Sequence, residues 1–130
     1  ERVIVRKHDY RASFQCVRNS ATDFSTLNVC AALWGDEWHL AVGARPKKAK
    51  FLEGDALALP RDYAPEELEA ACETARGLNY GTDRRASADY RAELAYVLSR
   101  RAIEAASAQL DVETEEKLAA EAAKPKGVSA

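Results

Sequence analysis

The chain has 130 residues, enough for one domain with a single hydrophobic core, and its 19 basic and 21 acidic residues give a formal net charge of −2. This balance argues against a nucleic-acid-binding surface or a basic membrane-binding patch. No apolar run is long enough to span a bilayer, and the opening residues lack the order of a signal peptide. These features predict a soluble, cytoplasmic domain without nucleic-acid or membrane partners.

The first strong pattern along the chain is a β-hairpin. From Ser25 the sequence reads STLNVCAAL, and its period of two places alternate apolar residues on one face of a half-buried strand. Turn residues follow at Gly35 and Asp36, and WHLAVGA resumes the alternation. The segment KKAKFLEG then predicts a short third strand with a basic edge. Before the hairpin, residues 1–10 fit either the end of a strand or a linker.

Two helices are predicted next. The segment LPRDYAPEELEAACETARGL has a proline for the first turn, acidic residues after it and Gly77 as a stop, which predicts a helix over about Pro65–Arg76. Ser87 is typical of an N-cap, and the second helix that it begins should reach at least Ala105. Its expected apolar face consists of Tyr90, Leu94, Val97 and Leu98.

The predicted fold class is α+β, a two-layer sandwich of a three-stranded antiparallel sheet with helices packed on one face. Residues 1–110 are expected to form this domain. Residues 111–130 are rich in Ala, Glu and Lys and end in KPKGVSA, so we expect a polar, partly helical tail with a disordered end.

Cysteine and histidine do not indicate a metal site. The three cysteines, Cys16, Cys30 and Cys72, are widely spaced and form no CxxC pair, so we expect reduced thiols and not a disulfide framework. The two histidines, His8 and His39, are too few to complete a metal site. The sequence contains no methionine, even at position 1. We therefore expect a fragment, a processed piece or a single domain of a larger protein.

The stretch DRRASADYR, residues 83–91, is the most charged candidate site. Arg84, Arg85 and Arg91 could clamp a phosphate or a carboxylate. The interpretation that we favour places Asp83 and Asp89 near a helix start, where the helix dipole stabilises them and local arginines pair with them. No glycine-rich phosphate loop is present, and no catalytic residue is predicted.

Three segments carry a family resemblance: RNSATDFSTLNVCAAL, AVGARPKKAKFLEG and DRRASADYRAELAYVLSRRAI. In this order, over about Tyr10–Ile103, they resemble the C-terminal domain of the flavoprotein component of molybdenum hydroxylases. This family includes carbon monoxide dehydrogenase and xanthine dehydrogenase. The resemblance implies an α+β sandwich within an FAD-dependent oxidoreductase, in which electrons pass between FAD and iron-sulfur clusters and a molybdopterin component oxidises the substrate.

The resemblance also implies a division of labour. Most of the FAD site belongs to upstream subdomains, so this chain would not be catalytic alone. Gln15 and Arg18 match the family segment that contributes a flavin contact. The implied partners are the upstream FAD-binding domain and the iron-sulfur and molybdopterin subunits or domains, and a homo-oligomer is a further expectation.

In the family pattern, the entrance to the last helix is structural. The matching residues are Asp83, Arg85, Ser87, Tyr90 and Arg91, and the resemblance implies that Ser87 caps the helix and Tyr90 packs in the core. Two other functions stay open: a free-standing protein-interaction module with this fold but no flavin, and, ranked last, a small hydrolase that uses Cys and His.

Overall fold

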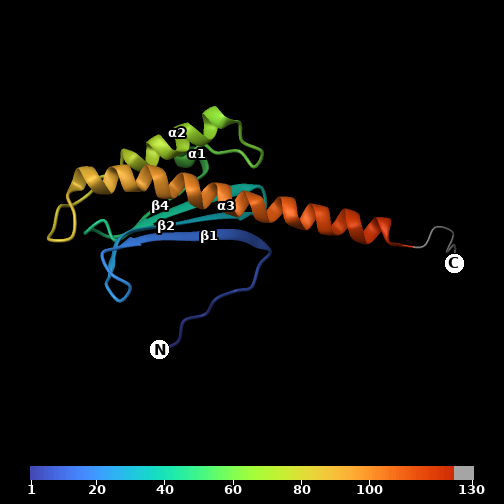
Figure 1. Cartoon of the computed structure of the whole chain (residues 1–130), viewed down its shortest axis with the longest axis horizontal. Coiled ribbons are helices and arrows are strands. Elements are labelled where there is room, and N and C mark those ends of the chain that lie inside the picture. The colour runs from blue at the N-terminus through green and yellow to red at the C-terminus, as the bar shows by residue number, and fades with distance from the viewer. Residues whose placement is uncertain (125–130) are drawn as a thin grey trace.

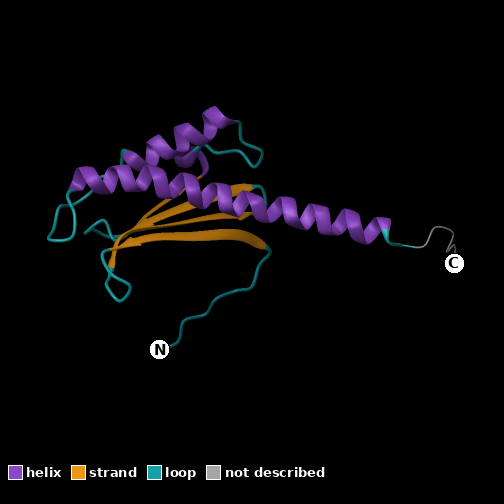
Figure 2. Cartoon of the chain, viewed as in Figure 1, coloured by secondary structure: helices purple, strands orange, loops and turns teal. Residues whose placement is uncertain are grey.

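The apolar alternation of the predicted hairpin produces one layer of a two-layer fold. In the computed structural model, which describes residues 1–124, an antiparallel sheet lies on one side and the helices lie on the other (Figures 1 and 2). The strands are β1 (Tyr10–Arg18), β2 (Ser25–Trp34), β3 (Glu37–Gly43) and β4 (Lys50–Glu53), and they pair in chain order. The helices are α1 (Gly54–Leu57), α2 (Pro65–Arg76) and α3 (Ala88–Ala122).

The core lies between the two central strands and the long helices. One parity of β2 and β3 is buried almost completely, and the register places these side chains on the same face. They are Leu27, Val29, Ala31, Leu33, Trp38, Leu40 and Val42. Leu68 and Cys72 of α2 and Leu98 and Ile103 of α3 pack with them. Burying each large apolar side chain contributes about 1.5–3 kcal/mol, so this interface supplies much of the folding energy.

Local signals located the hairpin and the helix starts correctly. Gly35 has φ of 62° in the β2–β3 turn, a left-handed conformation that glycine adopts readily. Helix α2 begins at Pro65 and ends at Arg76, as predicted. The Ser87 Oγ accepts a hydrogen bond from the Tyr90 amide at 3.2 Å, which confirms the predicted N-cap of α3.

The prediction of three strands is wrong, because the sheet has four. The additional strand is β1, whose polarity pattern is inverted. Its helix-side residues include Arg11, which forms an ion pair with Glu113 of α3, while Phe14 on the opposite face is 59% exposed. Gln109 of α3 also binds both the amide and the carbonyl of Ala12. Since polar groups of α3 cover one side of this edge strand, its sequence does not show the usual alternation of a half-buried strand.

The prediction that Tyr90 belongs to the buried apolar face of the last helix is also wrong. Tyr90 is 50% exposed and Val97 is 38% exposed. The buried face consists of Arg91, Ala95, Leu98, Ser99, Ala102, Ile103 and Ala106. It is rotated by about one residue from the prediction, because small side chains allow the helix to approach the sheet closely. The size of Tyr90 was therefore a misleading signal.

Helix α3 continues through Leu110 and Asp111 to Ala122 without a break. The expected boundary between domain and tail thus falls inside a helix, and a separate tail stays a prediction. Residues 114–124 are exposed. The disordered end predicted for KPKGVSA falls almost entirely on residues 125–130, outside the described residues.

Truncating Tyr90 and Leu98 distinguishes the two versions of the helix face. We expect Leu98→Ala to lower the free energy of unfolding by about 2–5 kcal/mol, because Leu98 is 2% exposed. We expect Tyr90→Ala to cost less than about 1 kcal/mol, because half of that side chain remains in solvent. Urea denaturation measures both values, and a larger loss for Tyr90→Ala would contradict this packing.

Candidate functional site

Arg91 is the centre of the charged stretch, and the protein itself binds its guanidinium. The side chain is 1% exposed. Its Nε donates to the Thr26 carbonyl at 2.9 Å, and Nη1 donates to the carbonyls of Gly81 at 2.8 Å and Ala86 at 2.9 Å. Nη2 donates to the Asp83 carboxylate at 2.7 Å. One side chain therefore joins β2, the loop before α3 and α3 itself.

A second buried arginine holds the opposite side of the same loop. Arg45 follows the end of β3 and is 8% exposed. Its Nε donates to the Asn79 carbonyl at 3.0 Å, and its Nη1 donates to the Lys48 carbonyl at 2.9 Å. The Gly81 amide donates to the Arg45 carbonyl at 2.8 Å. A Cβ at Gly81 would lie 3.3 Å from that carbonyl oxygen, so the close approach favours glycine.

The two arginines bring together the three segments on which the family resemblance rests. Thr26 belongs to the first segment, Arg45 to the second and Arg91 to the third, and all three contact residues 79–86 or each other. We call this set the arginine network. Its guanidinium groups are bound by backbone carbonyls and by Asp83, so they are not available as an anion clamp. The network supports the structural interpretation of residues 83–91.

Asp83 is the acidic member of the network. The side-chain hydrogen bond from Arg91, together with backbone hydrogen bonds from Arg85 at 2.9 Å and Ala86 at 3.2 Å, lowers the pKa of the Asp83 carboxyl to about 2. Arg85 itself donates to Asp23 at 3.3 Å, in the loop between β1 and β2. Of the two predicted acidic partners, Asp83 pairs with Arg91, whereas Asp89 lies in the first turn of α3 and forms no ion pair among residues 1–124.

The two predicted flavin contacts lie on β1. Gln15 is half-buried, and its Nε2 donates to the Ser13 Oγ at 3.1 Å. Arg18 is exposed at the end of the strand, next to an irregularity in the register, and its Nη1 lies 3.5 Å from the Ala21 carbonyl. The structure places the two side chains near one edge of the sheet but does not test a role in flavin binding. That role stays a prediction.

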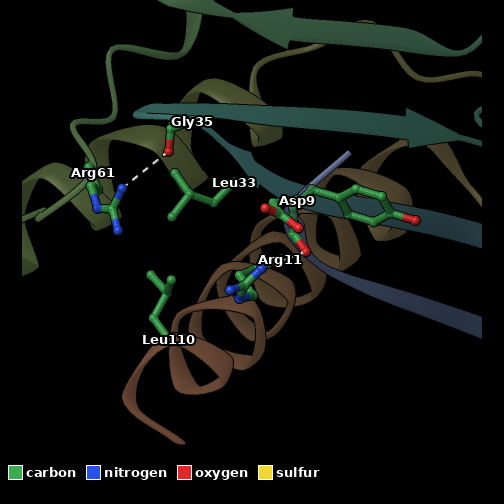
Figure 3. A pocket seen from close by; sticks show the side chains of 7 residues that line it. Asp9, Arg11, Leu33, Gly35, Arg61 and Leu110 are labelled. Atoms are coloured by element: carbon green, nitrogen blue, oxygen red, sulfur yellow. Dashed lines mark hydrogen bonds between the residues drawn. The ribbon is translucent and has the colours of Figure 1, made fainter. Parts of the chain in front are cut away.

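A small cleft of about 180 Å³ lies at the other end of the sheet (Figure 3). It is formed by the start of β1, the β2–β3 turn, the loop before α2 and Leu110 of α3. Arg61 donates to the Gly35 carbonyl at 3.3 Å and to Asp36 at 2.8 Å, while Arg11 pairs with Glu113. Both cations at this cleft are already neutralised by the protein, so the cleft offers little for binding an anion.

The thiols and histidines do not form a nucleophilic site among residues 1–124. Burial raises the pKa of Cys72 to about 11 and also raises the pKa of Cys30. This is the reverse of the shift that activates a thiolate. His39 lies 3.2 Å from the Glu53 carboxylate and stacks on Phe51. No described group of three or more Cys, His, Asp or Glu residues is arranged to hold a metal ion.

No protein-family model and no curated protein matches the chain, but solved structures do. Carbon monoxide dehydrogenase from Hydrogenophaga pseudoflava, in a form that lacks the Mo-pyranopterin moiety of its molybdenum cofactor, matches with a TM-score of 0.64 and 21% identity over 76% of this chain and 37% of its own. Quinoline 2-oxidoreductase from Pseudomonas putida 86 matches with a TM-score of 0.59 and 21% identity, over 76% of this chain and 38% of its own. The cyanide-inactivated form of Cu,Mo-CO dehydrogenase matches with a TM-score of 0.61 and 20% identity, over 80% of this chain and 39% of its own.

At this identity the likeness shows the fold alone. The chain has the α+β fold of one part of these oxidoreductases, which is the kind of fold that the sequence resemblance implied. It spans less than two fifths of the length of each matched chain. Within the described part, no helix has both the length and the apolar character to cross a membrane.

Sequence reasoning missed the structural role of Arg45 and the burial of Arg91. An arginine after a strand has no local signal for burial, because the Asn79 carbonyl that it binds lies 34 residues further along the chain. The close approach of Gly81 to the Arg45 carbonyl has no local signal either. The nearest available signal was Asp83, whose placement before a helix start already suggested local pairing with an arginine.

Removing the buried guanidinium should destabilise the domain strongly. We expect Arg91→Leu to lower the free energy of unfolding by more than about 3 kcal/mol, because three carbonyls and one carboxylate lose their donor. The matched control is Arg101→Leu, at an exposed position of the same helix, with an expected change within about 0.5 kcal/mol. If chemical denaturation showed a similar loss of unfolding free energy for the Arg91 and Arg101 variants, the structural role of Arg91 would be refuted.

The depressed pKa of Asp83 also predicts a pH dependence. Because the pKa is lower in the folded state, the ionised carboxylate stabilises the fold above about pH 4, and this contribution is lost as the pH falls toward about 2. The difference in melting temperature between the unmodified chain and Asp83→Asn should therefore shrink over this range. A difference that stays constant from pH 5 to about pH 2 would show that Asp83 titrates normally.

Proposed function

We propose that this chain is the C-terminal domain of the FAD-dependent subunit of a molybdenum hydroxylase. In this role it completes the flavoprotein fold and the packing of the subunit during electron transfer between FAD and iron-sulfur clusters. The observation that carries the proposal is the fold likeness to carbon monoxide dehydrogenase and quinoline 2-oxidoreductase over about three quarters of the chain. The convergence of the three resembling segments in the arginine network supports it.

The residues of this chain fit one part of a flavin site better than they fit a complete flavin site. Arg18 is exposed and has donors free for a phosphate or a flavin carbonyl, since one contact of 3.5 Å uses little of its capacity. No glycine-rich loop accompanies it in the sequence. FAD would supply the redox chemistry, and this chain would supply an edge contact through Arg18, with Gln15 three residues earlier on the same strand. The upstream FAD-binding domain and the iron-sulfur and molybdopterin components are the proposed partners.

A second candidate function is a free-standing interaction module. The observation that favours it is the sheet face turned away from the helices, where four large aromatic side chains are about half exposed. The coding sequence upstream of Glu1 separates the two candidates directly. An in-frame FAD-binding region supports the oxidoreductase domain, and a start codon close to Glu1 supports the module.

Flavin retention by the complete subunit tests the proposed role of Arg18. We expect Arg18→Ala to raise the Kd for FAD about tenfold, the effect of losing one charge-assisted hydrogen bond. Arg101→Ala should leave the Kd unchanged, and the isolated chain should show no saturable change in FAD fluorescence. Equal Kd values for the Arg18 variant and the unmodified subunit would remove Arg18 from the proposed flavin site.

A further inference from the structure

The sheet face opposite α2 and α3 is apolar and uncovered; we call it the open face. Strand register places one row of side chains across all four strands: Phe14, Cys30, Ala41 and Phe51. A second row contains Ala12, Ala32, His39 and Glu53. The exposed fractions are 54% for Tyr10, 59% for Phe14, 51% for Trp34 and 55% for Phe51. Few monomeric proteins leave such a group of aromatics in solvent.

The arrangement of large and small residues on the open face is complementary to itself. Phe14 and Phe51 stand on the two edge strands, and the small residues Cys30 and Ala41 lie between them on the central strands. Large side chains at the rim and small ones in the middle allow the rim of one copy to enter the middle of another. Facing sheets in β-sandwiches pack through interdigitated side chains of this kind.

The low charge of the open face also favours a second copy of the chain as the molecule that covers it. In the two rows across the open face, His39 and Glu53 are the titratable side chains besides the Cys30 thiol, and they lie 3.2 Å apart on neighbouring strands. A second copy therefore meets a nearly uncharged centre, and the exposed Glu37 carboxylate lies outside it, in the row of Tyr10 and Trp34. A strongly basic or acidic partner would find no matching charge there.

The chain's own N-terminal segment does not cover the open face. His8 packs against Trp34 at the end of the face where β1 begins, with ring centroids 4.5 Å apart and the rings tilted by 35°. Beyond this contact, Val3, Ile4 and Val5 are 93%, 70% and 84% exposed. The segment therefore borders the face and leaves the row from Phe14 to Phe51 accessible.

From these observations we propose that the open face is a homodimer interface, with a second copy of this chain as its occupant. Strand spacing and rise give a face about 19 Å wide and about 25 Å long, or about 500 Å² per copy. Two copies would bury about 1,000 Å², the lower limit for a specific interface. The dimer is therefore a reversible one that depends on concentration. This proposal is independent of the proposed oxidoreductase role.

Sedimentation equilibrium of the whole chain tests the dimer between about 1 µM and about 200 µM, where an interface of this size dissociates. We expect a mass that rises with concentration from 14.3 kDa toward twice that value. Phe14→Glu and Phe51→Glu should each weaken association at least tenfold while circular dichroism shows an intact fold. Two variants are used so that a local folding defect in one does not decide the outcome.

The matched controls lie outside the open face. Phe24 is 79% exposed in the loop after β1, and Ile4 is 70% exposed in the N-terminal segment. Phe24→Glu and Ile4→Glu should leave the association constant unchanged. A chain that stays monomeric up to about 200 µM would overturn the proposal. Association lost in a control variant but retained in Phe14→Glu and Phe51→Glu would overturn it too.

Discussion

The structure depends most on the buried guanidinium of Arg91. A charge in this position is costly unless every donor finds an acceptor, and the acceptors come from β2, from the loop before α3 and from Asp83. Planar, branched and permanently charged, an arginine can bind all of these groups at once, which a lysine cannot. The start of α3 is thereby fixed against the start of β2, near Thr26.

The path of α3 follows from this fixed point. Small side chains such as Ala95 and Ala102 let the helix lie close on the sheet, and its later turns reach the edge at β1. There Gln109 binds the backbone of Ala12, and Glu113 pairs with Arg11. The helix thus supports the fourth strand with polar contacts. Since both long helices lie on one side, the opposite face of the sheet is left open (Figure 1).

The elements predicted correctly from the sequence are those with local causes. The β2–β3 turn has its glycine, and α2 has its proline at the first turn. Ser87 caps α3 by accepting a hydrogen bond from the Tyr90 amide. Strand β1 and the burial of Arg91 depend on partners far away in sequence, such as Glu113 and Thr26, which no local pattern reveals. The candidate site shows the same limit. The pairing of Asp83 was predictable, whereas the flavin contacts of Gln15 and Arg18 rest on resemblance and stay predictions.

Native-state hydrogen exchange tests the central claim most directly, namely that the arginine network ties the loop before α3 to the sheet. The Gly81 amide is bound to the Arg45 carbonyl at 2.8 Å, and its own carbonyl accepts from Arg91. We expect the Gly81 amide to exchange about as slowly as the central amides of β2, because both should open only in global unfolding. Exchange at the rate of an unprotected loop, while β2 stays protected, would contradict this account.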